Sequence, residues 1–159
     1  MATSAPQVKP GVNAIVNAMT VDVEDYFQVS AFEPYVQKSD WEHLSCRVED
    51  NTSRILDLFA KQGVKATFFT LGWVAQRYPG LVKRIVSEGH EIASHGWEHV
   101  RVNTQQPEEF YQDIERTRKF LQDLSGQPVY GYRAASYSIG VDRKSTRLNY
   151  SHDQSPYAV

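Results

Sequence analysis

The sequence predicts an α/β fold with a parallel sheet, and two observations support that prediction. Strand-like and helical segments alternate in the order β-α-β-α-β-α-β between residues 14 and 135. Such alternation is typical of a parallel sheet, either doubly wound or closed as a barrel. Polar clusters also follow three of the four predicted strands, at the carboxyl ends where both architectures place their active sites.

The predicted strands are apolar segments bounded by polar or glycine-containing stretches. They cover residues 14–23, residues 65–71, the short stretch between Gly89 and His95, and residues 130–135. No internal repeat relates them.

Helical periodicity fills the connections between the strands. Apolar stripes predict helices over residues 48–62, from Gly72 through a continuation that starts at Pro79, and over residues 107–124. Residues 28–46 are mixed and aromatic, which predicts an irregular loop, and long loops of this kind are often functional.

Composition excludes several classes of protein. The chain has 159 residues, within the range of one domain, and its net charge of -2 indicates no nucleic-acid partner. Its single cysteine, Cys46, excludes an internal disulfide. No apolar run approaches the ~18 residues that span a bilayer, so we expect no membrane span. Because residues 1–11 lack the charged and apolar regions of a signal peptide, we expect a cytoplasmic protein.

The most informative stretch is residues 89–99, which contains three of the five histidines. His95 and His99 are four residues apart, so both imidazoles can reach one cation if the backbone makes a helical turn between them. Asp22, Glu24 and Asp25 crowd three carboxylates at the end of the first strand, which is costly unless a cation or solvent compensates. The alternatives are a chance histidine pair and a solvated acidic turn.

These residue types suit metal-assisted hydrolysis. Two neutral imidazoles and one carboxylate form a facial triad with open positions for water and substrate. A second carboxylate that does not bind the metal can act as general base, and Arg133, at the end of the fourth predicted strand, would orient that base. The predicted reaction is hydrolysis of an amide or ester through a tetrahedral intermediate.

Four motifs in a fixed order resemble a known family. They are Thr20-Val-Asp-Val-Glu-Asp-Tyr-Phe, Lys65-Ala-Thr-Phe-Phe-Thr-Leu-Gly, Gly89-His-Glu-Ile-Ala-Ser-His-Gly-Trp-Glu-His and Gly131-Tyr-Arg-Ala-Ala-Ser-Tyr-Ser. Together they resemble the polysaccharide deacetylases of carbohydrate esterase family four, and the first motif is similar to the exopolysaccharide-associated bacterial branch. The resemblance implies a distorted (β/α) barrel and metal-dependent removal of N-acetyl groups from a polysaccharide, usually with zinc.

The resemblance also implies roles for single residues. Asp22 matches the catalytic base, and Arg133 matches the arginine that pairs with the catalytic machinery. The metal ligands match His95, His99 and either Glu24 or Asp25, and the sequence leaves that choice open. The backbone around Ser136 matches the oxyanion contribution. Three aromatic side chains could also contact the sugar, namely Tyr26, Trp97 and Tyr137.

The chain departs from the family pattern in three places. Gly96 stands where the family usually has serine or threonine, and Ala135 stands where it usually has proline. The family's later motifs, which include a histidine that acts as general acid, are absent, and the only histidine after His99 is His152.

The C-terminal segment, residues 142–159, has no hydrophobic periodicity. Residues 142–145 match the translation of a sequencing adapter, GAT CGG AAG AGC. We therefore expect a flexible leader over residues 1–13, the N-terminal portion of a truncated deacetylase domain over residues 14–141, and a non-native tail over residues 142–159.

The leading hypothesis is a metal-dependent polysaccharide N-deacetylase whose activity is impaired by truncation. One alternative is an amidohydrolase that acts on small amides with the same barrel. Another is a non-catalytic metal-binding or interaction domain. The sequence does not indicate an oligomeric state.

Overall fold

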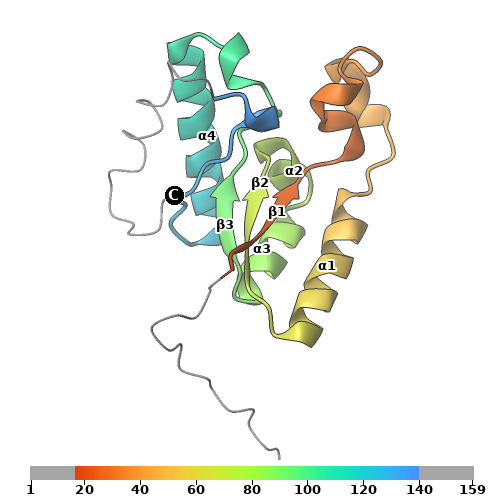
Figure 1. Ribbon diagram of the computed structural model, residues 1–159, viewed down its shortest axis with the longest axis vertical. Helices are drawn as coiled ribbons and strands as arrows, with labels where there is room; N and C mark the ends of the chain where they lie inside the picture. Colours follow the sequence, from red (N-terminus) through yellow and green to blue (C-terminus); the bar gives the residue numbers. More distant parts are fainter. Residues whose placement is uncertain (1–16, 140–159) are drawn as a thin grey trace, which may run out of the picture.

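A computed structural model describes residues 17–139, in which a three-stranded sheet packs against helices (Figure 1). The strands are β1 (Met19–Val23), β2 (Ala66–Thr70) and β3 (Glu91–Ser94), in the order β1-β2-β3. Both strand pairings are parallel. The predicted α/β fold with a parallel sheet is therefore confirmed. The expected leader and tail lie outside the described residues, as does the start of the first predicted strand.

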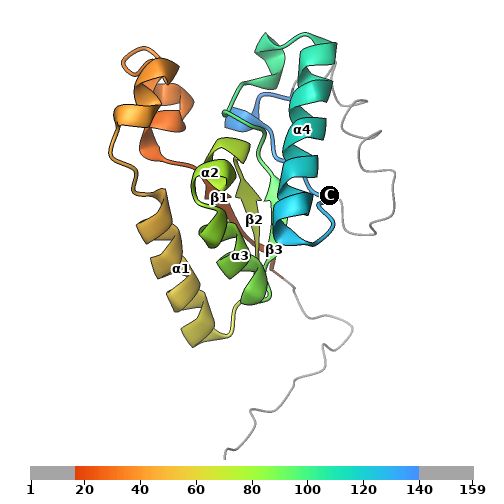
Figure 2. The ribbon, with the colours of Figure 1, turned by 180° about the vertical axis from the view of Figure 1, so that it is seen from behind.

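The helices are α1 (Val48–Gln62), α2 (Gly72–Arg77), α3 (Pro79–Ser87) and α4 (Pro107–Ser125). Helices α2 and α3 lie behind the sheet in Figure 1 and in front of it in Figure 2, so they cover one of its faces. No helix between residues 17 and 139 has the length and apolar character needed to cross a membrane.

Helix α1 illustrates how the sequence pattern produces this packing. Its buried residues are Val48, Thr52, Leu56 and Phe59, a spacing that keeps them on one side of the helix. The helix ends before Gly63, whose φ of 64° is left-handed and is easily adopted by glycine. The predicted bounds of 48–62 coincide with the observed helix.

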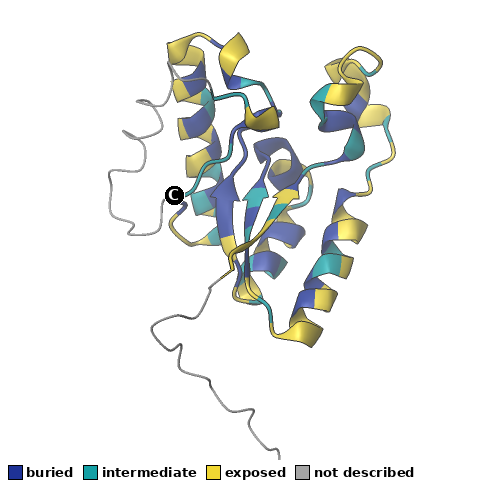
Figure 3. Ribbon diagram, in the orientation of Figure 1, coloured by how far each residue is buried: buried dark blue, intermediate teal, exposed yellow. Residues whose placement is uncertain are grey.

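Exposure is greatest in β1, at one edge of the sheet, and β3 is mostly buried (Figure 3). On the helix-covered face, Phe68 pairs in register with Ile92, and both are buried. On the opposite face, Asp22 pairs with Phe69, and neither residue is fully buried. Asp22 therefore lies on the face of the sheet opposite the helices.

The fourth predicted strand is wrong in extent. Residues 130–135 form a single parallel bridge, between Tyr132 and Ser94. Ser94 donates its N–H to the Gly131 carbonyl and accepts from the Arg133 N–H, at 2.8 and 2.9 Å. The chain then bends into a short 3-10 helix, Ala135–Tyr137, so pairing stops after one residue. The bridge still places Arg133 beside the end of β3.

The aromatic loop over residues 28–46 is irregular, as predicted. It contains short 3-10 helices at Ser30–Phe32 and Lys38–His43, after a first one at Tyr26–Gln28. Trp41 anchors this loop in the main core, where its ring contacts Phe27 and Trp73.

Candidate metal centre

The carboxyl ends of the three strands meet at one edge of the sheet. Val23 pairs with Thr70, and Thr70 pairs with Ser94, so the strands end at the same level. The residues that follow, Glu24 after β1 and His95 after β3, therefore leave the sheet at the same edge, on either side of β2.

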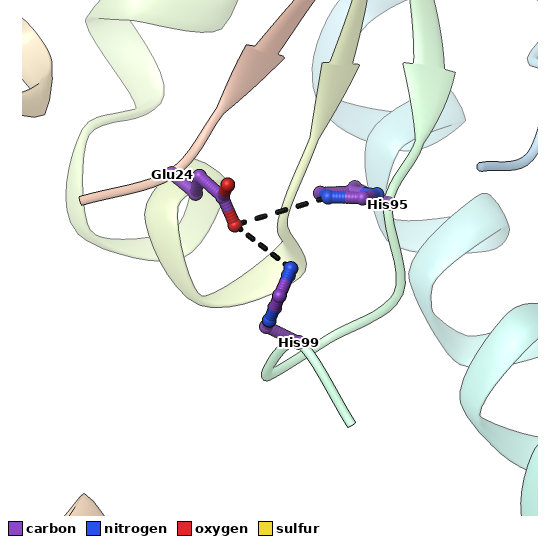
Figure 4. A group of neighbouring side chains, drawn as sticks. All are labelled: Glu24, His95 and His99. Atoms are coloured by element: carbon purple, nitrogen blue, oxygen red, sulfur yellow. Dashed lines mark ion pairs between the residues drawn. The ribbon is translucent and has the colours of Figure 1, made fainter. Parts of the chain in front are cut away.

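Three side chains form a cluster at this edge (Figure 4). Glu24 Oε2 lies 3.0 Å from Nε2 of His99 and 3.8 Å from Nε2 of His95. The two imidazole rings have centroids 5.1 Å apart. One oxygen and two nitrogens, all within 4.8 Å of one another, thus converge from two separate strand ends.

His95 is oriented by the chain that follows the predicted fourth strand. Its Nδ1 lies 2.8 Å from the backbone carbonyl oxygen of Arg133. A carbonyl only accepts, so Nδ1 carries the proton and donates it. Nε2 then keeps a free lone pair, which is the state that a metal ligand requires.

His99 reaches the cluster through an unusual backbone conformation. The prediction required a helical turn between the histidines, but the segment is not helical. His99 itself has a left-handed φ of 55°, and Gly96 has a φ of 80°. For a residue other than glycine such a conformation costs energy and persists only where surrounding contacts impose it.

Burial controls the charges of the cluster. It raises the pKa of Glu24 to about 7, with a smaller contribution from the negative charge of Asp22. Burial, with a smaller contribution from neighbouring His95, lowers the pKa of His99 to about 4. Burial also lowers the pKa of His95. Both shifts favour the neutral forms, so burial disfavours an ion pair between Glu24 and His99 in the metal-free site.

The cluster fits a divalent metal ion. Glu24 Oε2 is buried and accepts no hydrogen bond among the described residues, although two imidazole nitrogens lie close to it. A cation between these atoms would compensate the ionised carboxylate and bind the neutral imidazoles. Two imidazoles with one carboxylate are a common donor set for transition metals and zinc.

Asp25, the alternative ligand, lies outside the cluster. Its Oδ1 accepts from the backbone N–H of Tyr26 at 2.9 Å. Its Oδ2 accepts from the N–H groups of Arg47 and Val48, at 2.6 and 2.9 Å. Asp25 is 3 % exposed and ties the start of α1 to the end of β1, so both of its oxygens are already engaged.

Asp22 and Arg133 form a partly exposed ion pair beside the cluster. Arg133 Nη1 donates to Asp22 Oδ1, and Nη2 donates to Thr20 Oγ1 at 2.9 Å. The guanidinium lies over the ring of Phe69, 3.9 Å from its centroid. These contacts fix one oxygen of Asp22 and leave Oδ2 without a hydrogen bond from Arg133.

The residues expected to contact substrate differ in accessibility. Tyr137 is 90 % exposed, and Ser136 bonds through its hydroxyl to Ser30 at 2.6 Å. Tyr26 is half-buried beneath the Arg47 guanidinium, 4.4 Å from its ring centroid. Trp97 is 6 % exposed and packs against α4, so its ring is not an open platform for a sugar.

The sequence did not indicate the support that α4 gives to the histidine segment. Asp113 accepts a hydrogen bond from the Trp97 N–H at 3.1 Å, and the Arg116 guanidinium lies 3.5 Å from the Trp97 ring centroid. Asp113 and Arg116 are three residues apart and share one side of the helix. The sequence shows this helical spacing, but it does not show that these two side chains contact the histidine segment.

A cavity of about 210 Å³ opens beside His99, between the 28–46 loop and residues 98–104. Two ion pairs join these segments: Lys38 with Glu98 at 3.1 Å, and Arg101 with Glu33 at 2.6 Å. The aromatic loop is thereby held next to the cluster.

Comparison with known proteins supplies the family. The family described as polysaccharide deacetylase matches residues 40–151. The chain belongs to this family. The match includes both cluster histidines and Arg133, begins after the acidic motif at residues 22–25, and extends past residue 141, where we expected the domain to end.

Three similar proteins illustrate the relationship. The peptidoglycan-N-acetylglucosamine deacetylase PgdA of Listeria monocytogenes is 41 % identical over 86 residues, which are 50 % of this chain and 18 % of that protein. The chitooligosaccharide deacetylase of a Bradyrhizobium species is 30 % identical over 88 residues, 55 % of this chain and 40 % of that one. A solved peptidoglycan N-acetylglucosamine deacetylase is 27 % identical with a TM-score of 0.64, over 84 % of this chain and 52 % of the other.

The chain thus spans well under two thirds of the length of each of these relatives. The structural match covers about half of the solved deacetylase. This agrees with the predicted fold class, in which the described residues correspond to part of the deacetylase fold.

Proposed function

We propose that this chain is the metal-binding portion of a hydrolase that removes N-acetyl groups from a polysaccharide, with zinc as the metal. The observation that supports the proposal is the buried cluster of Glu24, His95 and His99 next to the Asp22–Arg133 pair. Membership of the polysaccharide deacetylase family supports deacetylation as the reaction in which this cluster would act.

Glu24, His95 and His99 would hold the metal, which when bound supplies Lewis-acid polarisation and a water of lowered pKa. The chain's own residues orient the ligands. The Arg133 carbonyl fixes the tautomer of His95. Glu24 Oε2 is buried, which keeps competing water away from it.

Asp22 would be the general base. Its Oδ1 is bonded to Arg133, so Oδ2 is the atom that would accept the proton of the attacking water. Arg133 acts as a positioning residue, because Thr20 and Phe69 fix its guanidinium in turn. A base held on one oxygen presents the other in a constant direction.

The segment Ala135–Tyr137 would bind the reacting acetyl group. Ser136 and Tyr137 have left-handed φ angles of 50° and 53°, a conformation that is sparsely populated for such residues and is found at binding sites. Backbone N–H groups held there could donate to the developing oxyanion. Tyr26 and Tyr137 remain the candidate contacts to sugar rings.

Protonation of the leaving amine needs an acid that the cluster does not supply. Of the other described histidines, His43 is exposed, and His90 lies at the opposite end of β3, where its Nδ1 contacts the Ala66 N–H at 3.2 Å. We therefore propose that the 159-residue chain binds metal but releases acetate slowly.

The substrate proposed is an N-acetylated polysaccharide. Two similar proteins are named for peptidoglycan N-acetylglucosamine and for chitooligosaccharides, which share an N-acetylated glucosamine unit. The Asp22-Val-Glu-Asp-Tyr-Phe motif resembles that of the exopolysaccharide-associated branch, and on this resemblance the polymer proposed is a bacterial exopolysaccharide.

Metal content and acetate release test the proposal. Purified chain should contain close to one zinc per molecule, and His95→Ala and His99→Ala should each lose it. Acetate release from N-acetylglucosamine oligomers should exceed release from small amides such as acetamide, and Asp22→Asn should reduce it while leaving zinc content unchanged. A chain with no stoichiometric metal would overturn the proposal, and preferential release from acetamide would favour the amidohydrolase.

A further inference from the structure

We propose that Asp113 of α4 is a positioning residue for the metal centre. It holds the segment between His95 and His99 in the conformation in which both imidazoles reach Glu24. The inference rests on the proposed function, because it assigns a supporting residue to the same cluster.

The direct contact is a forked hydrogen bond to the middle of the histidine segment. The Trp97 N–H donates to Asp113, with Oδ1 at 3.1 Å and Oδ2 at 3.4 Å. Trp97 lies two residues from each histidine. A carboxylate that accepts a backbone N–H makes a charge-assisted bond, stronger than one between neutral groups.

Gly96 lies against the same carboxylate, with no room for a side chain between them. A Cβ atom at this position would lie 2.9 Å from Asp113 Oδ2, closer than real Cβ contacts allow. Gly96 also has a φ of 80°, a conformation that favours glycine. The missing side chain and the backbone conformation together let Asp113 approach the segment.

The neighbouring contacts show that the segment is held from two sides. On the side of α2, the N–H groups of Gly72 and Trp73 donate to the carbonyls of Gly96 and Trp97, at 2.9 and 3.0 Å. On the side of α4, the Trp97 N–H is accepted by Asp113. Helix α2 thus binds the carbonyls of the segment, while α4 binds an N–H group.

Helix α4 also holds the Trp97 side chain. The Arg116 guanidinium lies 3.5 Å from its ring centroid, and the Phe120 ring packs against it edge-on at 5.3 Å. Asp113, Arg116 and Phe120 recur at helical spacing and form one side of α4. The backbone bond from Asp113 therefore belongs to a larger contact, and it is the part that acts on the backbone between the ligands.

The cluster needs such support because His99 has a left-handed φ of 55°. Contacts must offset the energy of this conformation, and without them the segment would relax toward more favourable angles. Relaxation would move the His99 imidazole away from Glu24, to which it is now 3.0 Å. The expected consequence is weaker metal binding by ligands that are all still present.

Zinc affinity of the 159-residue chain tests the inference, measured by competition with a chromophoric chelator at pH 7.5. We expect Asp113→Ala to weaken zinc binding about tenfold, the range in which outer supporting residues act. Asp113→Asn should stay within about threefold of the parent, because its amide oxygen can accept the same N–H. Asp123→Ala is the matched control: Asp123 lies on the same helix, is exposed and pairs with Lys119 at 3.2 Å.

A second variant approaches the same contact from the other side. Gly96→Ala should weaken zinc binding both through backbone strain and by displacing Asp113, so its effect should be smaller when Asp113 is already alanine. Circular dichroism and the urea midpoint of the metal-free variants report folding separately. A merely structural role would lower that midpoint and leave the affinity of the folded protein unchanged.

The outcomes separate the two proposals. If the parent chain does not bind zinc, the proposed function fails. If the parent binds zinc and folded Asp113→Ala binds it equally well, the positioning role fails. If Asp113→Ala does not fold, the other variants decide. The inference fails if Gly96→Ala binds zinc with the parent's affinity. It also fails if Asp113→Asn loses as much zinc affinity as the histidine variants.

Discussion

Glu24 Oε2 and His99 Nε2 lie 3.0 Å apart, although the two residues are 75 positions apart in the sequence, with two strands and three α-helices between them. Their pKa values are displaced in opposite directions, to about 7 for Glu24 and about 4 for His99. Each shift opposes the charge that the group would otherwise carry. The site therefore disfavours charge on both side chains, and a cation is the partner that allows Glu24 to ionise while His99 remains neutral.

The adjacent carboxylates Glu24 and Asp25 should separate metal binding from stability. Glu24→Gln removes the anionic ligand, so we expect zinc affinity to fall more than about 100-fold with little loss of stability. Asp25→Ala leaves three backbone N–H groups, those of Tyr26, Arg47 and Val48, without their acceptor. It should lower the free energy of unfolding by about 2 kcal/mol and leave zinc affinity nearly unchanged. Chelator competition and urea unfolding measure the two effects, and the reverse pattern would make Asp25 the ligand.

The metal-free protein should show two opposed pH dependences. Glu24 has a raised folded pKa, so its ionisation destabilises the fold above about pH 7, and this cost disappears as the pH falls to 4.5. His99 has a lowered folded pKa, so its cost is absent above pH 6.5 and grows as the pH falls to about 4. Each cost reaches about 3 kcal/mol, and in the parent chain their opposite pH dependences largely cancel.

Single variants should reveal these contributions. With EDTA present, the free energy of unfolding of the parent should rise relative to Glu24→Gln as the pH falls from 7 to 4.5. Relative to His99→Gln, it should fall between pH 6.5 and 4. Urea titrations at half-unit pH intervals measure both differences. Two difference curves of the same sign would show that the residues do not titrate as described.

Much of the fold could be predicted from sequence because it depends on local periodicity. The apolar stripe and following glycine predicted α1 over 48–62, and the observed helix is Val48–Gln62. The fourth strand could not be predicted in extent, because the number of residues that pair with β3 depends on where the chain bends after Arg133. That bend uses left-handed φ angles at Ser136 and Tyr137, residues that rarely adopt them.

The sequence predicted which residues gather at the candidate site better than it predicted which of them bind the metal. Strand ends in a parallel sheet bring Asp22, Glu24 and His95 together, whereas His99 reaches them only through the backbone conformation of the segment after β3. The choice between Glu24 and Asp25 depends on the direction of the backbone after β1. Only the contacts of Asp25 reveal it, because its Oδ1 accepts from the Tyr26 N–H and its Oδ2 from N–H groups at the start of α1. The contact between Asp113 and Trp97 likewise joins segments with no common motif.

Arg133 should prove to have separable backbone and side-chain roles. Its carbonyl orients His95, whereas its guanidinium holds Asp22 and Thr20. Arg133→Gln keeps the carbonyl, so zinc affinity should remain within about threefold of the parent. Loss of this partly exposed ion pair should cost about 1 kcal/mol of stability. Thr20→Ala, which removes only one hydrogen bond, is the milder comparison, and a large loss of zinc by Arg133→Gln would contradict the separation.

Gly72 and Gly80 provide a matched test of how closely the histidine segment packs. A Cβ at Gly72 would lie 2.3 Å from a ring atom of Trp97, whereas a Cβ at Gly80 would meet nothing within 4 Å. Gly72→Ala must displace Trp97, so it should lower the free energy of unfolding by about 2–3 kcal/mol and weaken zinc binding as well. Gly80→Ala should be neutral or stabilise by about 0.5 kcal/mol, with zinc binding unchanged. Urea unfolding and chelator competition on both variants measure these effects. If the two variants have the same stability and zinc affinity, Trp97 has room to move. The contacts described here then do not constrain the segment between the two histidines.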